Sequence, residues 1–435
     1  MTEVTQRALD TAGANVVYLR DPHDRAIRRA LEGDVDSVVI ISDDDNVSLR
    51  LALVVENVRP GVPLVVTVFG GIVASQLRRA VRNVRVLSMA DMVVPSLAGP
   101  CLDDRLLSVS RRDGGFSGVQ AGPDGPQLVP IEHYVPSRGQ WLLTHLGSLV
   151  KPFEVSARIL MVGLMGLVLI LALETIVLAM TFDEPLVDVF YLATRTLVTV
   201  GPNPLVTDGP DWVKVFSSLA MLAALGFAAI FTAGVVNRLL DMRLTALVGR
   251  RAIPRRDHVV VVGLGQVGLR LCLLLRELGV PVLVVERDPD NNHVNRAKEY
   301  GIPIVLGRGG SRFLLRRLCL GRARALAAVT SNEIENISVA VAALGMRGDL
   351  RTLLRAGRGE VVNETSSLFK IGVVRDVYRI GGTLLAAAAL GWQATEAFLD
   401  EQIVYLISPD GRIEPFDSDV EDARARETEL DQVES

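Results

Sequence analysis

The most apolar parts of the chain are two long stretches near its middle. Residues 157–181 contain two charged positions, Arg158 and Glu174, and residues 215–236 contain none. Because a helix rises 1.5 Å per residue, about 20 apolar residues cross the hydrocarbon core of a bilayer. The pattern therefore predicts two membrane-spanning helices, at residues 157–181 and 213–238. Two buried helices of a soluble core are a weaker alternative, because such helices are usually shorter and interrupted by polar residues.

The loop between the two stretches has a pattern of its own. Residues 186–198 are mostly apolar and predict a short helix, and Thr-Val-Gly-Pro-Asn-Pro follows at residues 199–204. This order, over residues 157–250, resembles the pore core of two-transmembrane potassium channels, and the residues that carry the resemblance are Tyr191, Thr196, Thr199, Val200 and Gly201. The resemblance implies a tetramer in which backbone carbonyls replace the water shell of a potassium ion. The implied ion pathway consists of Thr199, Val200, Gly201, Pro202 and Asn203.

The filter-like segment also departs from that family. Pro202, Asn203 and Pro204 stand where the family has Tyr, Gly and Asp. Proline fixes φ and removes a backbone N–H, and asparagine adopts left-handed conformations less readily than glycine. We therefore expect the inner ion sites, at Thr199 and Val200, to keep the family geometry better than the outer ones. A re-entrant loop that does not conduct remains an open alternative.

Two charges are expected at similar depth in the membrane. Glu174 lies near the outer end of the first span, and Arg195 lies in the short helix that descends beside it. Isolated charges at such a depth are costly and normally pair or face water. We predict an ion pair between Glu174 and Arg195, with separate water-filled crevices as the alternative.

The flanking charges predict the orientation of the spans. Acidic residues occupy the loop between the spans, and basic residues lie outside them, at Lys151, Arg158, Arg238, Arg243, Arg250, Arg251, Arg255 and Arg256. By the positive-inside rule, both long flanking regions and both chain ends are expected in the cytoplasm. The resemblance implies the inner or plasma membrane of a bacterium.

A short apolar strand at residues 258–262 opens a second region. A glycine-rich turn and an amphipathic helix follow, and a second strand ends at Glu286. In this setting the glycines permit a tight turn close to phosphates, the helix N-terminus attracts anions, and the acid can bind ribose hydroxyls. The expected nucleotide-binding residues are Gly263, Gly265, Gln266, Val267, Gly268, Glu286 and Arg308.

The strand–helix alternation continues over residues 255–395 and predicts a doubly wound parallel sheet. This segment resembles the RCK domain of TrkA N-terminal type, which regulates potassium channels and transporters. The resemblance implies NAD(H) or another adenine nucleotide as the ligand. In the family the third strand ends in Gly-Asp, whereas here Arg308 follows Gly307, so a phosphate-rich ligand could be favoured and its identity stays open.

The start of the chain repeats part of this region. Residues 16–40 align without gaps on residues 304–328 at an offset of 288, and the alignment matches Arg20 with Arg308, Arg28 with Arg316, Arg29 with Arg317 and Gly33 with Gly321. With a two-residue gap, Asn46 matches Asn336. The repeat predicts a second RCK-like domain within residues 1–135 that begins at its third strand, residues 15–19.

That first copy would lack its first strand, glycine turn, helix and second strand. Its third strand would then have no neighbour to pair its backbone groups. We hypothesise that the natural protein starts upstream of Met1 or that another chain supplies the missing half, and we expect no nucleotide site in this copy. Between and after the domains we expect a linker at residues 136–156, a hairpin at 396–415 and a disordered acidic tail at 416–435.

Composition narrows the functional class. The mean hydropathy of +0.34 fits a partly membrane-embedded chain, and the net charge of −4 argues against a nucleic-acid partner. No metal spacing or disulfide framework joins the cysteines. A dehydrogenase needs an acid or base near its nicotinamide, and within residues 255–395 the only histidines are His258 and His293. The predicted fold class is α/β plus membrane α, and the predicted function is a nucleotide-regulated potassium channel rather than an enzyme. The alternative function is a non-conducting, membrane-anchored nucleotide sensor.

Overall fold

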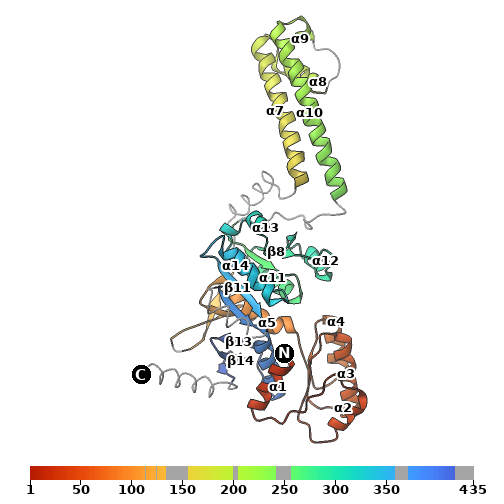
Figure 1. Ribbon diagram of the computed structural model, residues 1–435, viewed down its shortest axis with the longest axis vertical. Coiled ribbons are helices and arrows are strands. Elements are labelled where there is room, and N and C mark those ends of the chain that lie inside the picture. Colours follow the sequence, from red (N-terminus) through yellow and green to blue (C-terminus); the bar gives the residue numbers. More distant parts are fainter. Residues whose placement is uncertain are drawn as a thin grey trace. The chain divides into compact units, whose positions relative to one another are not determined.

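The computed structural model describes residues 1–112, 114–123, 125–133, 155–198, 204–241, 256–357 and 371–416. The chain separates into two compact units, Met1–Arg138 with Val248–Ser435 and Gly139–Leu247 (Figure 1). The predicted ion-pathway residues 199–203, almost all of the predicted linker 136–156 and all but the first residue of the predicted tail lie outside the described residues.

The C-terminal part of the larger unit is built on a parallel sheet. Its strands lie in the order β12-β11-β10-β7-β8-β9, and all neighbours are parallel. They are β7 (Val259–Val262), β8 (Val282–Glu286), β9 (Ile304–Leu306), β10 (Ala325–Ala328), β11 (Arg351–Ala356) and β12 (Val373–Asp376). Every residue of β7 and β10 is buried, as expected for central parallel strands covered on both faces. The order is that of a Rossmann-like fold.

Four helices connect these strands: α11 (Gln266–Glu277), α12 (Asn292–Glu299), α13 (Arg312–Arg317) and α14 (Glu333–Leu344), with a 3₁₀ turn at Leu320–Arg322. The side chains of Asn291, Ser311 and Asn332 cap α12, α13 and α14 by accepting hydrogen bonds from backbone N–H groups. Helix α11 differs, because its N-cap residue is Gly265, which has no side chain to accept a hydrogen bond. Its first N–H groups therefore lack the usual internal acceptor.

The sheet is followed by helix α16 (Val377–Ala389) and then by β13 (Glu396–Asp400), β14 (Ile403–Ile407) and β15 (Ile413–Pro415). These three strands are antiparallel. The segment predicted as a hairpin is thus a three-stranded meander, because β13 pairs with β14 ahead of the Pro-Asp-Gly turn.

The N-terminal part of this unit has a smaller parallel sheet in the order β1-β2-β3. Its strands are β1 (Val38–Ile40), β2 (Leu64–Thr67) and β3 (Val84–Leu87), and its helices are α2 (Asp24–Ala30), α3 (Asp45–Val58), α4 (Gly71–Ala80) and α5 (Met89–Leu102). An antiparallel meander follows, with β4 (Leu106–Arg112), β5 (Gly115–Gln120) and β6 (Gln127–Ile131).

The two parts of the unit repeat each other in structure as well as in sequence. Helices α13 and α16 and strand β14 begin 288 residues after α2, α5 and β5. A tertiary hydrogen bond recurs at the same offset: Ser48 Oγ donates to the Thr67 carbonyl at 2.8 Å, and Asn336 Nδ2 donates to the Arg355 carbonyl at 2.9 Å. Each bond ties a helix to the end of the following strand. Ser48 is therefore the counterpart of Asn336, and the match of Asn46 with Asn336 was wrong because no gap is needed.

The strand predicted at residues 15–19 is not formed. The segment has no strand pairing, and Val17 and Tyr18 are 70% and 51% exposed. In the C-terminal sheet the corresponding strand, β9, pairs only with β8. No counterpart of β8 lies beside residues 15–19 in the described part of the chain, so this segment has no ladder to join.

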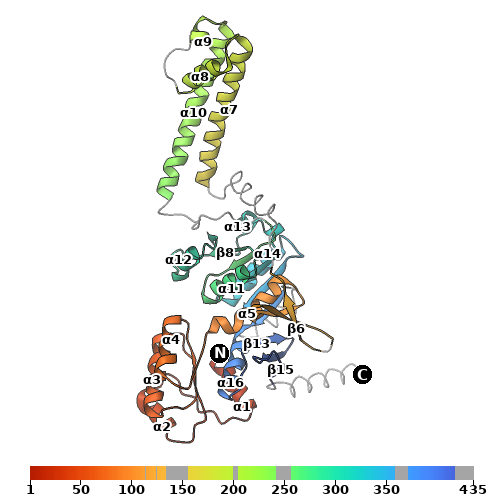
Figure 2. The same ribbon diagram turned by 180° about the vertical axis from the view of Figure 1, so that it is seen from behind.

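Helix α1 (Thr2–Thr11) packs against α16, while α5 packs against α11 (Figure 2). The approach is close, because a Cβ added at Gly382 would lie 2.9 Å from the Cγ1 atom of Val4. Helix α1 of the N-terminal copy thus contacts α16 of the C-terminal copy, as α11 of the C-terminal copy contacts α5 of the N-terminal copy. This contact joins the two copies, and buried residues of both contribute to one hydrophobic core.

The smaller unit contains α7 (Val155–Thr181), α8 (Leu186–Leu197), α9 (Pro204–Asp208) and α10 (Asp211–Asp241). Two segments, Ile159–Thr181 and Asp211–Val236, are long and apolar enough to cross a membrane. The short helix predicted at residues 186–198 is confirmed as α8. Helices α7 and α10 lie side by side in both views (Figures 1 and 2).

Small residues allow α7 and α10 to approach closely. A Cβ at Gly163 would lie 2.6 Å from the Phe231 nitrogen, and one at Gly234 would lie 2.7 Å from the Leu160 Cα atom. Glycines at membrane-helix interfaces commonly serve this purpose. Gly226 differs, because a Cβ there would meet nothing within 4 Å in the described part of this chain.

The predicted ion pair between Glu174 and Arg195 is not present. Glu174 is fully buried, and neither carboxylate oxygen has a hydrogen-bond partner among the described residues. The hydroxyl groups of Thr196 and Ser217 lie close to its carboxyl group, whereas the Arg195 guanidinium lies 6.0 Å from the centre of the Tyr191 ring. Similar depth was thus insufficient to predict pairing, because adjacent residues of α8 point in different directions.

Candidate functional site

The glycine-rich turn lies at the carboxyl end of β7, in the centre of the sheet. Gly263 has φ +101°, which L side chains rarely adopt, and a Cβ there would lie 2.9 Å from the Thr330 Cγ2 atom. A Cβ at Gly268 would lie 2.0 Å from the Gly263 carbonyl oxygen. These two glycines thus permit the tight turn and the close contact between α11 and β7.

Gly265 differs from the other two glycines because the space beside it is open. A Cβ there would meet nothing within 4 Å, and Gly265 and Gln266 are both exposed. Val267 begins the buried face of α11. A ligand could therefore approach the backbone at Gly265 and the uncapped N–H groups of α11, where the helix dipole favours negative charge.

Glu286, at the end of β8, stabilises the same turn. Its Oε2 atom accepts a hydrogen bond from the Leu264 N–H at 2.7 Å, and Oε1 accepts from the N–H groups of Arg287 and Asp288 at 2.7 and 2.9 Å. A carboxylate oxygen can accept two bonds. Oε2 therefore keeps capacity for a ribose hydroxyl while it fixes the glycine turn.

Arg308 follows the next strand, β9, and its side chain is exposed. It is held beside Glu286 through the backbone, because the Gly307 N–H donates to the Glu286 carbonyl at 2.8 Å. Gly307 itself has φ +156°. The structure thus brings the glycine turn, Glu286 and Arg308 to one edge of the sheet.

Two features of this edge were missed in the sequence. After β10, the Thr330 hydroxyl donates to Asn336 Oδ1 at 2.8 Å and keeps this loop next to Gly263. A Cβ at Gly309 would lie 2.3 Å from the Val262 Cγ1 atom, so Gly309 keeps the β9 loop close to β7. The signals were present, since Thr330 ends an apolar strand and Gly309 follows Arg308, but neither belongs to the glycine fingerprint.

The two histidines of the nucleotide-binding domain, His258 and His293, lie apart. His293 is in the first turn of α12, near Glu286, and partial burial lowers its pKa. His258 precedes β7 at the opposite edge of the sheet, is fully buried, and contacts the Leu318 carbonyl through Nε2 at 3.0 Å. Burial lowers the pKa of His258 to about 4.

This burial predicts a pH-dependent stability. The folded pKa of His258 lies below the ordinary value of 6.5, so the neutral ring is favoured in the fold. The contribution of the neutral His258 ring to the free energy of unfolding is complete above pH 6.5. This contribution decreases by up to about 3 kcal/mol as the pH falls through the range from 6.5 to below 4. Thermal unfolding of the larger unit in the full-length protein should shift to lower temperature between pH 7 and pH 5. His258→Gln should reduce this shift, and an equal shift in the variant would contradict the assignment.

The fold and the glycine turn define the class: a Rossmann-like domain with a dinucleotide fingerprint at the carboxyl edge of its sheet. Residues 259–371 match the TrkA-N domain family. The chain is 23% identical over 195 residues to the voltage-gated potassium channel Kch of Escherichia coli, covering 44% of this chain and 45% of that protein. It is 20% identical over 237 residues to potassium channel protein 1 of Methanocaldococcus jannaschii, covering 52% of this chain and 69% of that protein.

Solved structures are also similar. The crystal structure of the GsuK RCK domain matches 90% of this chain and 74% of its own, with 15% identity and a TM-score of 0.47. The GsuK channel bound to NAD matches 62% of this chain and 48% of its own, with 18% identity and a TM-score of 0.32. The chain spans less than half the length of Kch. These matches agree with the resemblance seen in the sequence: residues 259–371 match the TrkA-N domain, and the chain is similar in sequence to potassium channel proteins.

Proposed function

We propose that the chain is a subunit of a potassium channel or transport protein that is regulated by a nucleotide bound to its TrkA-N domain. The observation that carries the proposal is the combination, in one chain, of a TrkA-N domain with an open glycine turn and two apolar helices joined through a short helix, α8. The potassium-channel relatives support potassium as the transported ion.

The proposed ligand is NAD(H) or another adenine nucleotide. Gly263, Gly265, Gln266, Val267 and Gly268 would bind its phosphates, Glu286 would bind a ribose, and Arg308 would bind a further phosphate. Structures of GsuK have been solved with ADP and with NAD bound. The open backbone at Gly265 and the uncapped α11 support an anionic ligand here.

The proposed organisation is a tetramer in a bacterial plasma membrane, with both termini in the cytoplasm. Residues 157–250 would form the membrane module between an RCK-like domain within residues 1–135 and the nucleotide-binding domain of residues 255–395. The recurrence of α2, α5 and β5 as α13, α16 and β14 supports the first of these assignments. A ligand that favours one arrangement of the cytoplasmic domains would bias the ion pathway.

A second candidate is a non-conducting, membrane-anchored sensor of nucleotide. It is favoured by Pro202 and Asn203, which stand where channel filters have Tyr and Gly. Both residues restrict the backbone of a loop whose carbonyls would have to coordinate ions.

Ion flux into liposomes that contain the purified protein separates the two candidates. We expect potassium flux in the parent and a higher potassium-to-sodium ratio in the double variant Pro202→Tyr, Asn203→Gly, because the variant regains the backbone freedom of the family. Glu184→Gln, in the loop before α8, serves as a control that should leave the ratio unchanged. Equal ratios in parent and double variant would show that these residues do not limit selectivity, and absence of flux in both would favour the sensor.

A further inference from the structure

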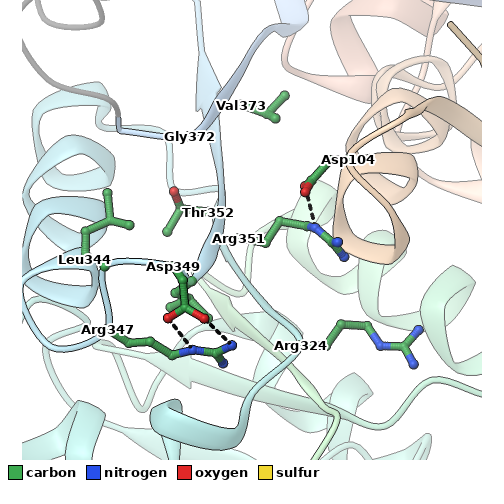
Figure 3. A pocket seen from close by; sticks show the side chains of 11 residues that line it. Asp104, Arg324, Leu344, Arg347, Asp349, Arg351, Thr352, Gly372 and Val373 are labelled. Carbon is green, nitrogen blue, oxygen red and sulfur yellow. Dashed lines mark hydrogen bonds and ion pairs between the residues drawn. The ribbon is translucent and has the colours of Figure 1, made fainter.

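A polar cavity lies at the edge of the C-terminal sheet opposite the glycine turn. It has a volume of about 350 Å³ and is lined by the beginnings of two strands, with Arg351 opening β11 and Val373 opening β12. Arg324, directly before β10, and Arg347, after α14, also line it (Figure 3). Three guanidinium groups thus surround one cavity, and none of them belongs to the nucleotide site.

Arg347 and Arg351 are fixed by hydrogen bonds to backbone carbonyls, whereas their acidic partners, Asp349 and Asp104, are exposed. Arg347 Nη1 donates to the Ala323 carbonyl at 2.7 Å, and Arg351 Nη1 donates to the Leu102 carbonyl at 2.8 Å. The side chains of Arg347 and Arg351 are 29% and 23% exposed, while those of their partners Asp349 and Asp104 are 77% and 70% exposed. The cations therefore form the wall of the cavity and the carboxylates its rim.

The repeat shows which of these arginines the fold itself requires. At the offset of 288, Arg347 corresponds to Arg59, which likewise donates to a backbone carbonyl, that of Gly33 at 2.5 Å. Arg324 and Arg351 correspond to Asp36 and Pro63. The bond made by Arg347 is thus common to both copies, whereas the other two arginines occur only in the copy with the cavity.

We propose that this cavity is a binding site for a small phosphate-bearing anion with at least two negative charges. Planar guanidinium groups bind phosphate oxygens through paired N–H donors. An anion in the cavity would replace the exposed carboxylates of Asp349 and Asp104 as acceptor while the backbone bonds of Arg347 and Arg351 stay intact. The cost of separating these pairs is small, because exposed ion pairs contribute little stability.

Binding of an anion in the cavity would also affect a contact at the beginning of the domain. Arg324 contacts both carboxylate oxygens of Asp257 at 2.7 Å. Asp257 has φ +50°, an unfavourable backbone conformation for a residue other than glycine, and it lies directly before His258 and β7. An anion that shares Arg324 weakens this contact, so backbone amides at residues 257–259 should exchange hydrogen at a different rate when the cavity is occupied.

The test uses pyrophosphate and the full-length protein in detergent micelles, with binding followed by calorimetry. The parent should bind saturably, and Arg351→Gln and Arg324→Gln should each weaken binding at least tenfold. Asp349→Asn should strengthen it several-fold, because a competing carboxylate is removed. Arg412→Gln is the matched control, since Arg412 forms an exposed pair with Asp410 away from the cavity.

A second comparison separates this cavity from the nucleotide site. Gly265→Ala should leave unchanged the pyrophosphate binding that is weakened in Arg324→Gln and Arg351→Gln. Loss of binding in Gly265→Ala together with normal binding in Arg324→Gln and Arg351→Gln would place the anion at the glycine turn and overturn the proposal. Absence of saturable binding in the parent, or weaker binding in Asp349→Asn, would overturn it as well.

Discussion

Gly265→Ala is expected to weaken NADH binding at least 100-fold without disturbing the fold of the TrkA-N domain. The added Cβ meets no protein atom within 4 Å, so the domain has no reason to rearrange. The same Cβ occupies the space through which phosphates would approach the backbone and the N–H groups of α11. The measurement is titration calorimetry with NADH on the full-length protein, with circular dichroism to verify the fold.

Gly268→Val provides the contrast. Its Cβ would lie 2.0 Å from the Gly263 carbonyl oxygen, which belongs to the backbone and cannot move alone. This variant should lose binding and also unfold at a lower temperature. Gly33→Ala, whose Cβ also meets nothing within 4 Å, should change neither property. Normal NADH affinity in Gly265→Ala would mean that the glycine turn does not bind the phosphates.

Glu174→Arg is expected to destabilise the membrane unit strongly. Glu174 is fully buried beside the Thr196 and Ser217 hydroxyls, and an isolated charge in the membrane costs about 2.5–3.5 kcal/mol or more. The second substitution Arg195→Glu should not rescue it, because Arg195 lies against Tyr191 rather than Glu174. Glu174→Gln should be tolerated, since an amide fits the same space and can donate to a hydroxyl.

The test is a double-mutant comparison of thermal unfolding in detergent. Additive losses in the charge swap are expected for residues that do not interact. Substantial recovery of stability in the swapped protein would contradict the structure and restore the ion pair predicted from the sequence.

Local patterns predicted much of this fold. The short helix was placed at residues 186–198 and is observed at Leu186–Leu197, because its apolar run is bounded by Pro185 and the polar filter-like loop. The strand, glycine turn and helix at residues 258–277 were predicted because each has a local signature. The repeat also predicted elements well, since α2 and α13 both contain two apolar residues followed by two arginines, at residues 26–29 and 314–317.

Features that depend on distant residues were not predicted. The segment at residues 15–19 has the apolar character of a strand, but a strand also needs a neighbour, and sequence propensity does not supply one. The pairing of Arg351 with Asp104 spans 247 positions, and no local pattern indicates it. Glu174 was assigned a partner by depth alone, although direction around the helix decides which side chains meet.

The central claim is that nucleotide bound at the glycine turn regulates potassium movement by this protein. The most direct measurement is potassium flux in liposomes with and without NADH, for the parent and for Gly265→Ala. The account predicts that NADH changes the flux of the parent and leaves that of Gly265→Ala unchanged, with equal basal flux in both. An equal response to NADH in the two proteins would contradict it.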